Sequence, residues 1–225
     1  MRYAIYYTPP AGSALHALGS RWLGRDVFGM PVAEPVTSAE PFIADARRYG
    51  FHATLKAPFA LRAGTTVEGL LAMTAALARK IPAVLLHELE ISDMHGFLAL
   101  RPREQDHDLA ELERNCLCHL DQFRANPSAE ELARRNISAL SVRQKKHLSD
   151  WGYPFVLDAF RFHMTLSCQL EGAELAAVHD MAARHFAPVT GRRHLIDSIA
   201  VFHEEAPGAP FTVLEEFSLN RAQAA

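Results

Sequence analysis

The feature of this sequence that most constrains its fold is the pattern Phe-His-x-Thr-Leu, which occurs at Phe51–Leu55 and again at Phe162–Leu166. Apolar and polar residues alternate around both copies, as is typical of a β-strand with one buried face. The histidine and the threonine of each copy are two positions apart, so they should share the polar face of their strand. Two such strands predict two equivalent structural units.

The same kinds of element are predicted after each copy, namely a helix and then two strands. Residues 67–80 and 174–186 have helical apolar spacing, and Thr65-x-x-Glu68 resembles a capping box at the start of the first helix. About half of the chain separates the two histidines, so duplication with pseudo-twofold symmetry is the natural explanation. Symmetric halves commonly meet at a cleft, and we expect one here. The predicted strand pairs cover 84–91 with 97–101, and 194–203 with 211–219.

Length and composition are those of an ordinary globular protein. The chain has 225 residues, of which 49% are hydrophobic and 22% charged. We expect a single domain, 1–225, made of a first lobe (2–105), a helical middle (106–152) and a second lobe (153–225). An apolar start broken by two prolines, and the lack of a long apolar run, predict neither a signal peptide nor a membrane partner. Three cysteines indicate no disulfide framework, so we expect a cytoplasmic protein.

The formal net charge of −3 argues against a broad nucleic-acid surface, although a local basic cleft stays open. Basic residues do gather in the predicted helical middle, where they form either a solvated helical face or one wall of an anion-binding cleft. The members of this basic cluster are Arg134, Arg135, Arg143, Lys145 and Lys146. A small phosphorylated substrate is therefore favoured over RNA, and the oligomeric state is not indicated.

Two histidines and two threonines converging on one cleft would suit phosphoryl chemistry. Histidine titrates near pH 6.5, so one ring can accept a proton from the attacking oxygen while the other protonates the leaving oxygen. His52 and His163 are the catalytic candidates. Thr54 and Thr165 would donate hydrogen bonds to the non-bridging phosphate oxygens.

Three further residues are candidates for substrate binding. Lys56 should lie on the same face of its strand as His52, where it could add a cationic contact. Arg161 should share the face of His163, and Tyr153, in a Trp-Gly-Tyr-Pro turn, could reach the cleft.

These motifs resemble those of the two-histidine (2H) phosphoesterase superfamily, which includes the LigT-like cyclic phosphodiesterases. Nearly the whole chain is similar to a DUF1045-type family, often encoded among phosphonate-utilisation genes. The resemblance implies an α+β, bilobal, pseudo-twofold fold with two antiparallel β-sheets flanking a central cleft and helices on the outside. It also implies a metal-independent mechanism and the same four histidine and threonine positions. The matching segments are Trp22–Asp26, Tyr49–Phe59, Trp151–Pro154 and Phe160–Leu166.

Other chemistries have little support in the sequence. Cys116-x-Cys118-His119 suggests a metal site, but two cysteines two positions apart diverge on a helix and no second pair completes a zinc set. Neither a Gly-x-x-x-x-Gly-Lys nor a Gly-x-Gly-x-x-Gly loop is present. We therefore expect no metal and no cofactor.

The leading hypothesis is hydrolysis of a small cyclic phosphodiester, such as a ribose cyclic phosphate arising in phosphonate breakdown. The alternatives are an RNA-end 2′,3′-cyclic phosphodiesterase or ligase-like enzyme, and a non-catalytic protein that binds a phosphorylated metabolite. Which histidine is the acid, which is the base, and which bond of the ring opens are left open, because the environment of each ring decides them.

Overall fold

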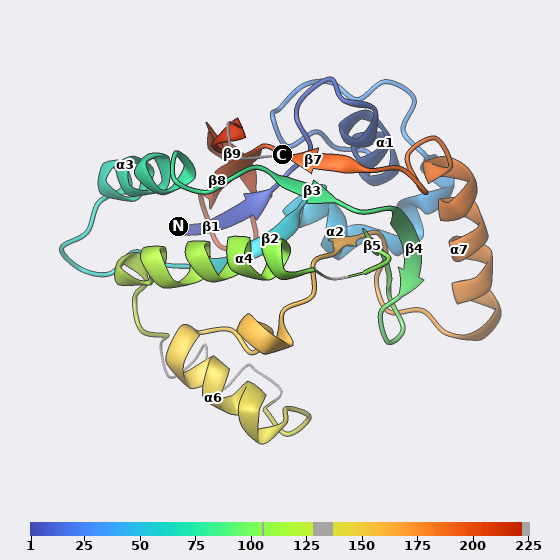
Figure 1. The fold of residues 1–225 in the computed structure, drawn as a ribbon. Helices are drawn as coiled ribbons and strands as arrows, with labels where there is room; N and C mark the ends of the chain where they lie inside the picture. Colours follow the sequence, from blue (N-terminus) through green and yellow to red (C-terminus); the bar gives the residue numbers. More distant parts are fainter. Residues whose placement is uncertain (105, 128–136, 222–225) are drawn as a thin grey trace.

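A seven-stranded antiparallel sheet with the strand order β4-β5-β6-β2-β1-β8-β9 forms the centre of the molecule (Figure 1). The computed structural model describes residues 1–104, 106–127 and 137–221. Within them β3 and β7 form a second, two-stranded antiparallel sheet. The expected α+β class with two antiparallel sheets is confirmed. The strands are β1 (Arg2–Tyr7), β2 (Ala53–Phe59), β3 (Val84–Leu86), β4 (Leu89–Asp93), β5 (Leu98–Pro102), β6 (Met164–Thr165), β7 (His194–Ile196), β8 (Ser198–Glu204) and β9 (Thr212–Ser218).

Helices surround this sheet, with α4 packed on β2, α3 beside β8 and β9, and α7 near β4 at the opposite end (Figure 1). Side-chain caps begin several of them; for example, Thr66 accepts a hydrogen bond from Gly69 N–H, one residue after the expected Thr65. Among the described residues, none of the helices has both the length and the apolar character needed to cross a membrane. The helices are α1 (Ala14–Leu23), α2 (Ala44–Tyr49), α3 (Val67–Ala78), α4 (His107–Leu120), α6 (Val142–Trp151) and α7 (Gly172–Phe186), with 3-10 turns η1 (Thr37–Phe42), η2 (Asp121–Phe123) and η3 (Leu157–Ala159).

The two repeated units share these sheets. Ala53 of β2 pairs with Met164 of β6, and each is the central residue of its own His-x-Thr motif. The equivalent strands β3 and β7 also pair with each other. The hairpin β4–β5 of the first unit joins β6 of the second, while β8–β9 of the second unit joins β1 beside β2. The pairs β2–β6 and β3–β7 are antiparallel, as a twofold relation requires, whereas the hairpins join the sheet differently, because β5 is next to β6 but β1 lies between β2 and β8.

The lobe boundaries stay predictions. Of the expected helical middle, 106–152, the structure describes α4, η2 and α6, whereas 128–136 lie outside the described residues.

The apolar faces of both motif strands are anchored in the core. Phe51 and Phe162 are at most 1% exposed, and so are the leucines that end the two motifs, Leu55 and Leu166. Burying a side chain of this size stabilises a fold by about 1.5–3 kcal/mol. A one-residue slip of either strand would place these groups in solvent and its histidine in the core. Core packing thus determines which way the motif polar groups face.

Lys56 does not follow the predicted alternation, and the expectation that it lies beside the histidine of its motif is wrong. Thr54 pairs with Tyr6 of β1, but Lys56 pairs with Ile5, and the register shift between the two pairs leaves Leu55 as an extra residue. Neighbouring residues of a strand point to opposite faces. Thr54 and Lys56 therefore do so as well, because a β-bulge separates them.

Candidate active site

The rings of His52 and His163 are each held by a hydrogen bond to the backbone carbonyl oxygen of the residue two positions earlier. Nδ1 of His52 lies 2.8 Å from the carbonyl oxygen of Gly50, and Nδ1 of His163 lies 2.7 Å from that of Arg161. A carbonyl oxygen only accepts, so each Nδ1 carries a hydrogen and donates it. In the neutral rings the Nε2 atoms are then the unprotonated nitrogens, which can accept a hydrogen bond or a proton. Both rings are half-buried, each directly before a strand rather than within it.

Gly50 lets the chain make this contact at the first motif. Its φ of 79° lies in the left-handed region, and an added Cβ would be 2.1 Å from Cγ1 of Val27. A residue with a side chain would strain the backbone and overlap Val27. The turn at Gly50 therefore ends α2 and brings a carbonyl oxygen to the ring of His52.

Aromatic side chains enclose both candidate rings. Tyr6 stacks on His52 at a centroid distance of 3.8 Å with 25° between the planes, and Tyr49 lies 6.2 Å away. Phe97, at the tip of the β4–β5 hairpin, lies 5.8 Å from His163. These contacts limit ring rotation, so the two Nε2 atoms keep their directions.

The paired strands bring the two motifs together. Because Ala53 faces Met164 in antiparallel register, His52 and Thr165 occupy neighbouring positions, as do Thr54 and His163. Thr54 also contacts its own histidine, with Oγ1 3.2 Å from Nε2 of His52. Thr165 is half-buried and pairs with Ala99 of β5. The register of β2 and β6 therefore puts the two histidines and two threonines at neighbouring positions, although of these four residues only Thr54 and His163 line the cavity described next, and their roles stay predictions.

A cavity of about 600 Å³ lies beside this cluster, a size that suits a small metabolite. Thr54 from the first motif and His163 from the second both line it, together with Arg161 and Tyr153. Apolar side chains, including Phe97, form much of the remaining wall. His52 is not a lining residue; its Nε2 contacts the hydroxyl of Thr54, which is one.

Burial shifts the pKa of both histidines in the same direction. Desolvation lowers the pKa of His52 to about 4; the hydrogen bond to Gly50 opposes this shift, and the nearby His163 adds to it. Desolvation also lowers the pKa of His163 from its usual value, against the opposing hydrogen bond to Arg161. An interior favours the neutral imidazole over the imidazolium. Both rings are thus predominantly neutral at pH 7 in the ligand-free protein.

Arg161 and Tyr153 line the cavity, but neither is a free side chain. Nη1 of Arg161 donates to the carbonyl oxygens of Asp158 (3.0 Å) and Phe160 (2.6 Å). Tyr153 packs edge-on against Phe155 at 5.6 Å. These contacts stiffen the segment that precedes the second motif. Their roles in substrate binding stay predictions.

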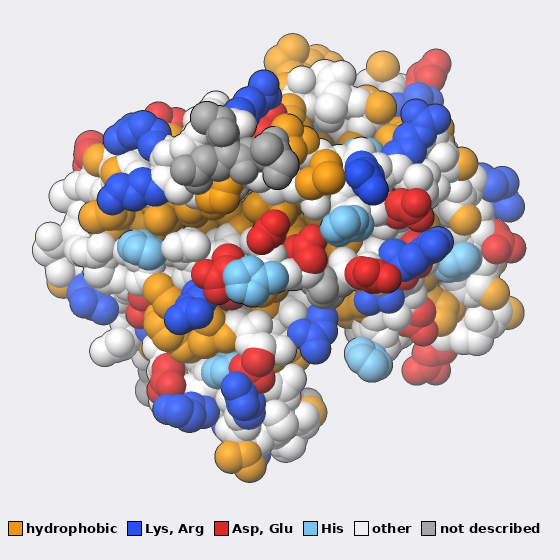
Figure 2. Space-filling view, in the orientation of Figure 1, with side chains coloured by type: hydrophobic (Ala, Val, Ile, Leu, Met, Phe, Trp, Pro, Cys, Tyr) orange, Lys and Arg blue, Asp and Glu red, His pale blue; other side chains and the backbone are white. Residues whose placement is uncertain are grey.

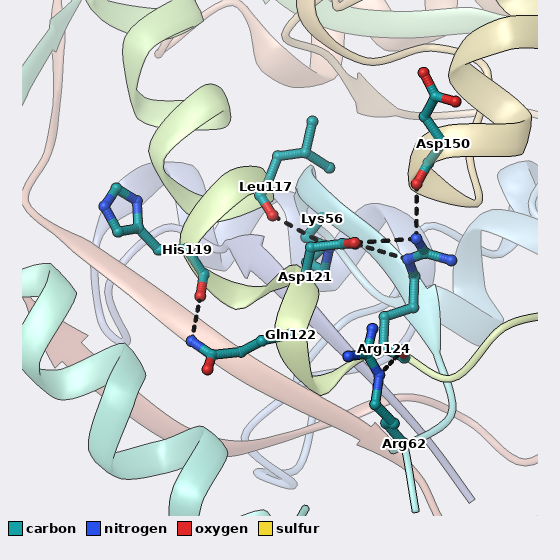
Figure 3. A network of polar contacts seen from close by, with 8 residues as sticks. All are labelled: Lys56, Arg62, Leu117, His119, Asp121, Gln122, Arg124 and Asp150. Atoms are coloured by element: carbon teal, nitrogen blue, oxygen red, sulfur yellow. Dashed lines mark hydrogen bonds and ion pairs between the residues drawn. The ribbon is translucent and has the colours of Figure 1, made fainter.

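Lys56 belongs to a separate polar network under α4 (Figure 3). Only 2% of its surface is exposed, and its ammonium donates to Asp121 Oδ1 at 2.8 Å and to the Leu117 carbonyl oxygen at 3.3 Å. Arg124 binds the same carboxylate at 2.7 and 3.0 Å. Burial lowers the pKa of Lys56, although Asp121 opposes this shift. Lys56 is not among the cavity residues, so its position fits a structural role.

Sequence reasoning missed Glu113, an acidic side chain that lines the cavity. Glu113 is 1% exposed, and burial raises its pKa to about 7. A signal for it existed in the sequence. On α4, Glu113 belongs to the stripe of buried positions that also contains Leu109, Leu112, Cys116, Leu117 and Leu120. A charged residue within an apolar helical stripe is uncommon and needs an explanation.

Two of the three described members of the basic cluster, Arg143 and Lys146, are paired with acidic residues. Arg143 contacts Asp158 at 2.6 Å, and Lys146 contacts Asp150 at 2.8 Å. Figure 2 shows acidic and basic side chains interspersed on the face that carries α4 and α6. These pairs favour the interpretation as a solvated helical face. Arg134 and Arg135 lie outside the described residues.

Within the ranges that the structure describes, no group of three or more His, Cys, Asp or Glu side chains could hold a metal ion. Cys116, from the motif that suggested a metal site, is buried in the core, whereas Cys118 is exposed.

A family model described as "Protein of unknown function (DUF1045)" matches residues 54–212. Two proteins named ribose 1,5-bisphosphate phosphokinase PhnN match nearly the whole chain. The protein from Janthinobacterium sp. (strain Marseille) is 39% identical over 93% of this chain, and that from Laribacter hongkongensis (strain HLHK9) is 36% identical over 94%. The matches cover 49% and 50% of those proteins, so this chain spans about half of their length.

Solved structures offer more distant likenesses. Escherichia coli LigT in its apo form has a TM-score of 0.49 at 14% identity, with 98% of each chain covered. LigT complexed with 3′-AMP also has a TM-score of 0.49, at 13% identity and the same coverage. A protein from Thermus thermophilus has a TM-score of 0.48 at 17% identity, covering 98% of this chain and 99% of its own.

Proposed function

This chain is a member of the DUF1045 family, and we propose that it is a metal-independent phosphoesterase that opens a small cyclic phosphodiester by two-histidine acid–base catalysis. The observation that carries the proposal is the pairing of the two motifs at Ala53 and Met164. That pairing brings both imidazoles to one site, each with its Nδ1 bonded to a backbone carbonyl. Nε2 of His52 also lies 3.2 Å from the Thr54 hydroxyl, which would turn to the phosphate before that nitrogen takes up a proton.

His52 is the proposed general base. Its pKa of about 4 keeps the ring neutral at physiological pH, so Nε2 can accept a proton from water. The water oxygen attacks phosphorus, the ring P–O bond breaks, and the departing oxygen takes a proton from Nε2 of His163. The product is a phosphomonoester with one new hydroxyl group, and one histidine has gained the proton that the other has lost.

His163 acts as the general acid only in its protonated form. Burial lowers its pKa in the ligand-free protein. A bound phosphodiester places a negative charge next to the ring, and a nearby opposite charge favours the imidazolium. Substrate binding therefore prepares the acid. Thr54 and Thr165 would donate hydrogen bonds to the non-bridging oxygens, where charge grows in the transition state.

The names of the relatives suggest a substrate class. They are described as kinases of ribose 1,5-bisphosphate, whereas the 225 residues of this chain contain no Gly-x-x-x-x-Gly-Lys loop of the kind that holds nucleotide phosphates. We therefore assign the phosphoesterase step, and not the kinase step, to this chain. A ribose cyclic phosphate, as arises in phosphonate breakdown, is the proposed substrate.

The test compares asparagine variants of the two histidines. In His52→Asn and His163→Asn the side-chain amide can still donate to the carbonyl that Nδ1 contacts, but Nε2 is lost. Each variant should lower kcat on ribose 1,2-cyclic phosphate by at least about 100-fold, the lower range for one acid or base. His119→Asn is the matched control, because this exposed ring also has Nδ1 near a carbonyl oxygen, that of Asn115, at 3.0 Å.

Metal independence is tested in the same assay. Activity should survive exhaustive treatment with EDTA and 1,10-phenanthroline. Activity that disappears and returns with zinc or manganese would contradict the metal-independent mechanism. Tight binding of the cyclic phosphate without turnover, unaffected by either asparagine substitution, would favour the non-catalytic binding protein instead. Strongly salt-dependent binding and cleavage of RNA ends would favour the RNA-end enzyme.

A further inference from the structure

Glu113 is the one carboxylate among the described residues that line the cavity. It extends from the buried stripe of α4, with 1% of its surface exposed. Its oxygens lie 3.4 and 3.3 Å from Leu157 N–H at the start of η3. Leu157 N–H is the only group in the described part of the chain that donates a hydrogen bond to Glu113. A carboxylate can accept about four hydrogen bonds, so Glu113 has unused acceptor capacity.

A buried carboxyl group with unused acceptors is costly unless something satisfies it. Both oxygens of Glu113 share the Leu157 N–H, so neither is unpaired, but one long shared hydrogen bond offsets only part of the cost of burying a carboxyl group. Lys56 is close enough to affect the charge of Glu113, but its ammonium bonds to Asp121 and to a backbone carbonyl. Leu157, held at a φ of 56°, supplies one N–H for two oxygens. Within the described residues no other donor reaches Glu113, so a further partner would come from the cavity that it lines.

The position of Glu113 limits what that ligand group can be. In the proposed mechanism the phosphate contacts Thr54 and His163, two of the lining residues that can donate hydrogen bonds. A second phosphate next to Glu113 would face an acidic group, and like charges repel. A hydroxyl group fits either state of Glu113, because it can donate to a carboxylate or accept from a carboxylic acid. Burial, which raises the pKa of Glu113 to about 7, allows both states near neutrality.

We propose that Glu113 binds a free hydroxyl group of the substrate and so selects cyclic phosphodiesters of polyhydroxylated sugars over those of simple diols. The proposal rests on the phosphoesterase function given above and adds the specificity residue for the same cavity. A cavity of about 600 Å³ has room for a sugar beyond the phosphate group. A site built to hydrogen-bond a hydroxyl group strongly disfavours ligands that lack one, because its own polar group is then left unpaired.

The test measures discrimination as a ratio. The value of kcat/KM for ribose 1,2-cyclic phosphate is divided by that for propane-1,2-diol cyclic phosphate, in the wild type and in Glu113→Leu. The ratio should fall by about 10- to 100-fold in the variant, the range for one hydrogen bond to a charged group. Glu113→Gln, whose oxygen can still accept from Leu157 N–H, should keep most of the discrimination. An unchanged ratio in Glu113→Leu would mean that Glu113 only supports η3, and would overturn the proposal.

A binding measurement separates this proposal from the catalytic one and does not depend on the variant folding. Calorimetry on the wild type compares ribose 5-phosphate with propyl phosphate. Ribose 5-phosphate should bind at least about 10-fold more tightly. Equal affinity would overturn the selection of hydroxyl groups. Preferential binding of the ribose ligand by a protein that hydrolyses neither cyclic phosphate would remove the catalytic function and leave this inference standing.

Discussion

Replacing Lys56 by methionine tests whether this residue supports the fold or binds substrate. Its ammonium is bonded to Asp121 and to the Leu117 carbonyl oxygen, and 2% of its surface is exposed (Figure 3). Methionine keeps an unbranched apolar stem of similar length but removes the charge and its two hydrogen bonds. Asp121 would still be bound by Arg124 at two atoms. No charge is left unpaired, so we expect a loss of about 1–3 kcal/mol in the free energy of unfolding.

Removing the carboxylate of Asp121 should lower the free energy of unfolding more than removing the ammonium of Lys56. Asp121→Ala leaves the buried ammonium of Lys56 without its carboxylate, and breaking a buried pair in this way typically costs about 3–5 kcal/mol. Urea titration followed by circular dichroism measures both losses. Lys146→Met is the matched control, because the pair of Lys146 and Asp150 is exposed on α6 and should contribute less than about 1 kcal/mol.

The kinetic result decides between the two roles. Without urea, where the variant is folded, Lys56→Met should have a KM for the cyclic phosphate within about twofold of the wild-type value, since Lys56 does not line the cavity. A raised KM with an unchanged free energy of unfolding would refute the reasoning. It would mean that the ammonium binds substrate, as the simple alternation of the strand predicts.

Two further predictions follow from the pKa shifts. For a substrate without a phosphomonoester, kcat/KM should fall on the acid side with an apparent pKa of about 4, as the base His52 becomes protonated. On the alkaline side kcat/KM should fall with an apparent pKa below 6.5, as His163 loses the proton that it must donate. A profile in which both apparent pKa values lie above 6.5 would contradict these assignments. Glu204 is 1% exposed, and although burial opposes the shift, hydrogen bonds from Arg2 and Arg48 lower its pKa to about 2. Its folded pKa is below its ordinary value of 4.5, so its contribution is present above pH 4.5 and is lost as the pH falls toward 2. That contribution is about 3 kcal/mol, and in Glu204→Gln the urea midpoint should vary less between pH 5 and pH 2.

The sequence alone determined the two motifs, the faces of Phe51, Leu55, Phe162 and Leu166, and a helix followed by strands after each motif. These follow from local rules, because the period of apolar residues and the identity of capping residues act over a few positions. The strands predicted over 84–91 and 194–203 each divide into two, β3 with β4 and β7 with β8, which belong to different sheets. The repeat also predicted pseudo-twofold symmetry, since two similar units with complementary faces tend to meet. The structure agrees in the pairing of Ala53 with Met164.

Tertiary structure decided what depends on residues far apart in the chain. The face of Lys56 reversed because the register of β2 against β1 includes a bulge, and alternation within a single strand carries no information about its partner. The low pKa of His52 depends on burial, with Tyr6 of β1 stacked on its ring, and the surroundings of Glu113 include the Leu157 N–H of η3; both contacts join residues far apart in the chain. A local pattern tells which residues can carry a charge. Only tertiary packing sets the free-energy cost of burying that charge and the groups that form hydrogen bonds or ion pairs with it.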